Sequence, residues 1–91
     1  MSAIKGTTKT GFEFELREEL LDDYELVVLF GKANEDIRHI DELAEHMLGS
    51  KQKKALIEHL RGANGTVKLS DMMNALADVE AAFPSPAGKN S

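Results

Sequence analysis

Apolar and charged residues alternate near the start of the chain, from Phe12 to Leu16. Phe12, Phe14 and Leu16 would lie on one face of an extended strand and Glu13 and Glu15 on the other, because successive side chains of a strand point to opposite sides. The residues before them are rich in Gly, Thr and Lys, which suits a turn. We therefore predict a β-hairpin over residues 3–16. A two-stranded hairpin is marginal by itself in water, so it should lie on a helical body or pair with another chain.

Five consecutive apolar residues follow, Leu26-Val27-Val28-Leu29-Phe30. Asp22 or Asp23 can cap a helix, which favours a helix over residues 22–32, although an apolar run of this length also occurs in buried strands. A surface helix usually carries a single apolar stripe. A helix that is apolar on every side is either the central helix of the domain or one that shares its surface between the core and a partner.

Three later segments repeat apolar residues at helical spacing. The predicted helices span residues 36–48, 51–61 and 71–83, with Asn34, Ser50 and Ser70 as their N-terminal caps. Gly49 is placed to end the first of them and Pro84 the last. The pattern thus predicts an α+β, mostly helical fold, in which an N-terminal β-hairpin is followed by about four short α-helices. Residues 84–91 have no apolar anchor and are predicted to be a disordered tail after a single domain over residues 1–83.

Composition narrows the class of protein. The chain has 91 residues, no cysteine and a formal net charge of −5. Nucleic-acid-binding proteins usually present a basic face, whereas the one basic cluster here, Lys51, Lys53 and Lys54, reads as a solvated helix face. No apolar run approaches the roughly 18 residues that cross a bilayer. We expect a soluble, intracellular protein that binds neither nucleic acid nor membrane.

The sequence gives little support for a metal site. In an EF-hand reading with Gly65 as the sixth loop residue, Leu60 and Gly62 would occupy positions that must supply oxygen ligands. His39 and His46 are seven residues apart, which is too far for the usual pair of zinc ligands one turn apart on a helix. We expect no metal site and interpret the histidines as exposed helix residues.

Candidate catalytic and cofactor sites are equally weak. Acyl carrier proteins present Asp-Ser-Leu at a helix start, but the order here is Leu69-Ser70-Asp71, and Ser70 is more simply a helix cap. No nucleophile comes with a recognisable base, and the glycines at 62 and 65 lack the spacing of a phosphate-binding loop. We expect no catalytic residue, no cofactor and no enzyme activity.

Several short blocks in a fixed order resemble one family. They are Ile4-Lys5-Gly6-Thr7-Thr8-Lys9-Thr10-Gly11-Phe12, Leu20-Leu21-Asp22-Asp23-Tyr24-Glu25-Leu26, Met47-Leu48-Gly49-Ser50-Lys51-Gln52-Lys53-Lys54-Ala55-Leu56, and Glu58-His59-Leu60-Arg61 with Gly65-Thr66-Val67. Together they resemble the tail assembly chaperones of long-tailed bacteriophages and prophages of Gram-positive hosts.

The resemblance implies a non-enzymatic protein of the host cytoplasm. Such chaperones coat the tape measure protein, keep it soluble, help recruit tail tube protein subunits and are absent from the mature virion. Self-association is expected, through the hairpin edge or the helix at residues 22–32. The alternative is a structural virion component, such as a head-tail connector or minor tail protein. The residues predicted to bind a partner are Leu26, Val27, Val28, Leu29, Phe30, Met72 and Met73.

Overall fold

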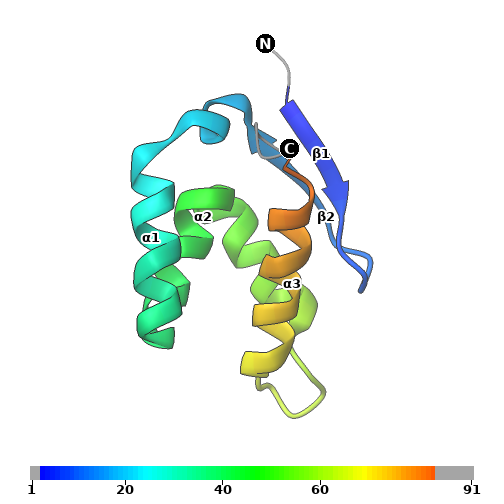
Figure 1. Ribbon diagram of the computed structural model, residues 1–91. Helices are drawn as coiled ribbons and strands as arrows, with labels where there is room; N and C mark the ends of the chain where they lie inside the picture. The colour runs from blue at the N-terminus through cyan, green and yellow to red at the C-terminus, as the bar shows by residue number, and fades with distance from the viewer. Residues whose placement is uncertain (1–2, 84–91) are drawn as a thin grey trace.

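The computed structural model describes residues 3–83, which form an N-terminal hairpin and a body of helices. In chain order the elements are β1 (Ala3–Thr7), β2 (Glu13–Arg17), η1 (Glu18–Asp22), α1 (Tyr24–Glu35), η2 (Ile37–His39), α2 (Ile40–Leu60) and α3 (Leu69–Ala81). α2 lies between α1 and α3, and the hairpin packs on α2 and α3 (Figure 1). The α+β, mostly helical class is confirmed.

The hairpin forms as the alternating pattern predicts. β1 and β2 pair antiparallel, with Ile4 opposite Leu16 and Gly6 opposite Phe14. Phe14 and Leu16 are 3% and 1% exposed, so the hairpin lies on the helical body through one apolar face. The turn is closed by the Thr8 N–H donating to the Phe12 carbonyl at 2.8 Å.

The hairpin turn is also fastened to the helices. The backbone N–H of Lys9 donates to Asp78 Oδ2 of α3 at 2.9 Å. The Phe12 ring lies 5.6 Å from the His59 ring of α2, measured between centroids. These contacts fix the far end of the hairpin against the C-terminal halves of α2 and α3.

α1 is longer than predicted. The expected cap is confirmed, because Asp23 accepts a hydrogen bond from the Leu26 N–H at 3.2 Å. The helix then continues through Gly31 to Glu35, so Asn34 lies inside α1 rather than capping the next helix. A single glycine costs a helix only about 1 kcal/mol, which packing of the half-buried Ala33 on the core can offset. Asp36 is the residue that caps the following turn, by accepting from the Arg38 N–H.

The predicted count of four helices was wrong, because the described residues form three. The helices expected over 36–48 and 51–61 are one element, α2, bent at Gly49, whose φ of 81° and ψ of 161° are not helical. This backbone conformation is open almost only to glycine. Gly49 therefore changes the direction of the chain without a loop. Ser50 does not cap a helix, and its hydroxyl donates to Glu45 instead.

One lysine, whose side chain is mostly buried, holds the bend in α2. Lys53, after the bend, donates from Nζ to Asp41 Oδ2 at 3.0 Å and lies 2.8 Å from Glu45 Oε1, both before the bend. The hydrogen bond from Lys53 holds the pKa of Glu45 below its usual value of 4.5. The side chain of Lys53 is only 14% exposed, so this lysine is not part of a solvated helix face as the sequence suggested.

α3 begins earlier than the predicted helix over residues 71–83. Its first residue is Leu69, and Lys68 stands at the N-cap with no side-chain hydrogen bond, so the predicted Ser70 cap was wrong. Lys68 contributes no capping oxygen, and sequence rules for caps therefore miss this start. The glycine loop before it closes locally, with the Gly62 N–H donating to the Thr66 carbonyl at 2.9 Å. The tail predicted over residues 84–91 lies outside the described residues.

The core draws on β2, η1 and the three α-helices. Its buried apolar residues are Phe14, Leu16, Leu20, Leu26, Leu43, Ala44, Met47, Leu48, Leu56, Ala75, Leu76 and Val79. Among the described helices, none combines the length and the apolar character needed to cross a membrane.

Candidate partner-binding surface

The apolar run on α1 is divided between the core and the surface. Leu26 is buried at 3% exposed, and Leu29 and Phe30 are half-buried. Val27 and Val28 are 68% and 36% exposed. Five consecutive residues of a helix point around its whole circumference, so packing on α2 can cover only part of this run.

A groove opens between α1 and α3, with a volume of about 280 Å³. Its lining residues are Phe30, Ala33, Asn34, Ile37, Ile40, Leu43, Met73, Leu76, Ala77 and Glu80. Most of them are apolar, and Met73 is 44% exposed at the edge of the groove. The sequence pointed to Phe30 and Met73 but not to Ile37, which follows α1 in chain order.

A second groove of about 400 Å³ lies at the start of α1. It is lined by Leu20, Leu21, Asp22, Asp23, Tyr24, Leu26, Val27, Phe30 and Phe83. Phe30 lines both grooves, so the two adjoin at this residue. We call six of the apolar residues that line these grooves the α1 strip: Leu21, Tyr24, Val27, Phe30, Ile37 and Met73.

The spacing within the α1 strip follows the helix. Tyr24, Val27 and Phe30 are three residues apart, which places their side chains along one side of α1. Tyr24 is 81% exposed, the most open of the large apolar side chains. A partner helix lying along α1 would meet these residues in succession.

The methionines named from sequence have different surroundings. Met73 lines the groove between α1 and α3. Met72 is half-buried against the core and lines none of the grooves described above. Met47 is 2% exposed and belongs wholly to the core.

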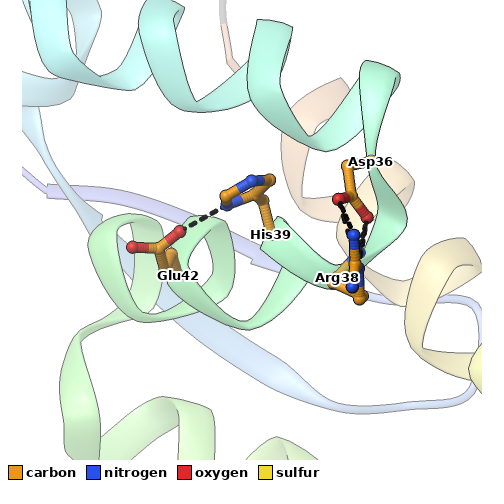
Figure 2. Close-up of polar contacts among 4 residues, drawn as sticks. All are labelled: Asp36, Arg38, His39 and Glu42. Carbon is orange, nitrogen blue, oxygen red and sulfur yellow. Dashed lines mark hydrogen bonds and ion pairs between the residues drawn. The ribbon is translucent and has the colours of Figure 1, made fainter.

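The turn between α1 and α2 sets the position of Ile37. Asp36 and Arg38 flank Ile37 and form a bidentate ion pair, with Arg38 Nη2 donating to Asp36 Oδ2 at 2.7 Å. One turn on, His39 Nδ1 lies 2.7 Å from Glu42 Oε1. Figure 2 shows both pairs on the ribbon between the helices. The hydrogen bond from Arg38 holds the pKa of Asp36 below its usual value, so this turn keeps its ion pair under mildly acidic conditions.

One cluster of possible metal ligands lies beside the α1 strip, among the residues 3–83 that the structure describes. Ligand atoms of Asp23, Glu25 and His46 lie within 4.8 Å of one another. His46 Nε2 donates to Asp23 Oδ2 at 2.8 Å, while Oδ1 of the same carboxylate accepts the Leu26 N–H. Both oxygens of Asp23 are thus engaged, and the cluster sits at a helix N-terminus, whose partial positive charge disfavours a cation. We interpret these residues as a tie between α1 and α2.

The histidines do not gather into one site within the described part of the chain. His46 bonds to Asp23, and His39 to Glu42. His59 lies 3.1 Å from the Thr10 hydroxyl in the hairpin turn. His46 and His59 therefore each join two distant segments of the fold, a role that their sequence spacing did not reveal, whereas the contact of His39 is local.

A few acidic side chains border the α1 strip. Glu80 lines the groove between α1 and α3, and Asp22 and Asp23 line the groove at the start of α1. Asp71 and Asp78 of α3 lie elsewhere, beside Lys9 and Thr10 of the hairpin turn. The strip is therefore an apolar surface flanked by carboxylates at both grooves.

Comparisons of the chain with protein families, with curated proteins and with solved structures found no match.

Proposed function

We propose that this chain is a non-enzymatic tail assembly chaperone that binds a helix of a phage tape measure protein along the α1 strip. The proposal rests on the resemblance of the sequence blocks to that family and on one structural observation. That observation is the pair of mostly apolar grooves along α1 that adjoin at Phe30. The host cytoplasm is its proposed place of action, before the tail tube protein assembles, and the mature virion would lack it.

The shape of the surface supports a helical partner. Amphipathic helices commonly bind by laying an apolar face into a groove between helices. The two grooves meet at Phe30, so a single helix can run from Tyr24 to Ile37 without leaving apolar contact. The flexible side chain of Met73 can adapt to different residues, which suits a protein that must cover a long and varied partner.

The charge around the strip adds a preference. Asp22 and Glu80, one at each groove, would favour a partner helix whose apolar stripe is flanked by lysine or arginine. Screening by salt weakens such rim contacts, whereas the apolar contact remains. Binding should therefore persist in moderate salt while becoming slower to form.

Co-expression with the tape measure protein of the same phage or prophage tests the proposal. The wild-type chain should keep that protein in the soluble fraction and co-purify with it. Val27→Glu should abolish both effects, because it places a charge in the middle of the strip. Leu69→Glu is the matched control, since Leu69 is 51% exposed but lines neither groove.

Two results would overturn the proposal. One is a tape measure protein that precipitates equally with and without this chain. The other is equal loss of binding for Val27→Glu and Leu69→Glu. Mass spectrometry of purified virions addresses the alternative: retention of the chain in the particle would favour a structural virion component such as a connector or minor tail protein.

A further inference from the structure

The two edges of the hairpin differ in whether their outward backbone groups have hydrogen-bonding partners. On β2, the side chain of Gln52 takes the place of a neighbouring strand. Its Oε1 accepts the Glu15 N–H at 2.7 Å, and its Nε2 donates to the Glu15 carbonyl at 2.7 Å. The same Nε2 donates to the Leu48 carbonyl at 2.8 Å, which fixes the amide in place. Both outward backbone groups of Glu15 are therefore hydrogen-bonded.

The β1 edge has no such cover. Lys5 lies opposite Glu15 in the register of the hairpin. Because both backbone groups of Glu15 point outward to Gln52, this is a non-hydrogen-bonded pair, and the N–H and C=O of Lys5 also point away from the hairpin. By the period of two, those of Ala3 and Thr7 share that direction. Within residues 3–83, the outward backbone groups of Lys5 have no hydrogen-bonding partner.

We propose that β1 pairs antiparallel with β1 of a second copy, which gives a four-stranded sheet across a two-fold axis. An exposed strand edge is a template for another strand, and a two-fold axis requires a self-complementary register. The residues of β1 allow such a register, because the strand carries a single charged residue, Lys5, and the two copies of it can be kept apart. This surface is separate from the α1 strip, so the inference does not rest on the proposed function.

The choice of register follows from the side chains. A pair centred on Lys5 would set two ammonium groups directly opposite, which is unfavourable. A pair centred on Gly6 would have no side chains at its closely spaced central position. A pair centred on Ile4 brings two half-buried isoleucines into the closely spaced position and sets each Lys5 opposite Ala3. The structure thus points to the Ile4-centred register.

Gln52 limits this association to a pair of chains. A hairpin with two open edges could add copies at both sides and grow into a filament. Here the dimer uses both β1 edges, and its outer strands are the β2 strands, which the Gln52 side chains cover at Glu15. A closed dimer of about 20 kDa is therefore the expected state, twice the 10.0 kDa of the chain.

Light scattering on size-exclusion fractions, over a wide range of concentration, tests the pairing. The wild-type chain should dimerise, and Lys5→Pro should weaken the dimer at least about tenfold, because proline removes the outward N–H in both copies. Lys5→Thr, which keeps that N–H, is the control and should still dimerise. Circular dichroism checks that Lys5→Pro keeps the fold, as expected for a proline on an edge strand whose N–H faces solvent. A wild-type chain that stays monomeric, or a folded Lys5→Pro dimer of unchanged affinity, would overturn the proposal.

Cysteine cross-linking tests the register. The chain has no cysteine of its own, and an Ile4→Cys pair would have Cα atoms about 4.5 Å apart, within the range of a disulfide. Ile4→Cys should therefore oxidise to a covalent dimer. Thr7→Cys, on the same strand and more exposed, should not, because the two positions lie far apart in this register. Equal cross-linking of the two variants, or none in Ile4→Cys, would refute the register.

Gln52→Ala tests the closure. It uncovers Glu15 on β2, so species larger than a dimer should appear as the concentration rises. A Gln52→Ala chain that remains strictly dimeric would show that Gln52 does not limit association.

Discussion

The hairpin and α1 both contain short, strongly apolar segments, yet they end in different environments. In β2, every second residue is apolar, so one face of the strand takes all of them, and Phe14 and Leu16 are almost fully buried. In α1, consecutive apolar residues point in all directions, and the core covers Leu26 but leaves Val27 open. Apolar residues that match the period of their element become core. Apolar residues beyond those that the period places on the buried face remain at the surface, accessible to a partner.

Among substitutions that keep the protein folded, the largest expected effect comes from shortening a buried side chain of the hairpin. Leu16→Ala should destabilise the fold by about 2–5 kcal/mol, because it leaves a cavity beneath the hairpin. Val27→Ala should change stability by no more than about 0.5 kcal/mol, as for an ordinary surface position. Urea unfolding followed by circular dichroism measures both. Equal losses for the two variants would erase the distinction between core and surface segments.

Glycines in the two segments should respond in opposite directions. A Cβ on Gly6 would lie 2.6 Å from Cζ of the Phe14 ring, so Gly6→Ala should cost about 1–3 kcal/mol by displacing that ring. A Cβ on Gly31 of α1 meets nothing within 4 Å, so Gly31→Ala should stabilise the helix by about 0.5–1 kcal/mol. Thermal melts of the two variants give the signs directly. A stabilised Gly6→Ala chain would mean that Phe14 does not pack on β1 as described.

A charge on the exposed side sharpens the comparison further. Val27→Glu should leave the free energy of unfolding within about 0.5 kcal/mol of the wild-type value, since the residue lies at an exposed position. Leu26→Glu, one residue earlier, should prevent folding, because it buries an unpaired carboxylate. The contrast is measured by circular dichroism of the purified chains. An unfolded Val27→Glu chain would assign the whole run to the core.

The smallest expected effect concerns acid. The hydrogen bond from His46 and then that from the Leu26 N–H hold the pKa of Asp23 below its usual 3.8. The stability that this carboxylate contributes is therefore present above about pH 3.8 and is lost as the pH falls through the lower pKa of the folded state. Asp23→Asn keeps a good helix cap but no charge. Its melting temperature should fall less than that of the wild type between pH 5 and pH 3, and parallel curves would contradict this.

Local rules predicted the parts of this fold that depend on neighbouring residues. The alternation at Phe12–Leu16 and the cap at Asp23 needed no knowledge of distant contacts, and both are confirmed. The helical backbone does break at Gly49, where the sequence predicted a stop, but the sequence did not show that the two halves form one bent element. Lys53, Asp41 and Glu45 hold the two halves together across it, and those pairs become visible only in three dimensions.

The candidate surface was likewise predicted only in part from the sequence. The run from Leu26 to Phe30 was recognised as having too many apolar residues for one face, but which of them lie outward depended on how α1 packs. Ile37 was not recognised, because it reaches the groove through the turn set by Asp36 and Arg38. Gln52 at the edge of β2 gave no signal either, since a glutamine on a helix surface is ordinary until its partner strand is known.

The bend at Gly49 has a mechanical consequence for the whole molecule. Gln52, just past the bend, holds the hairpin, whereas the half of α2 before the bend carries α1 through His46 and Asp23. The backbone of Gly49 thus lies between the contact to the hairpin and the contact to α1, and the ion pairs of Lys53 with Asp41 and Glu45 hold the two halves of α2 at one angle.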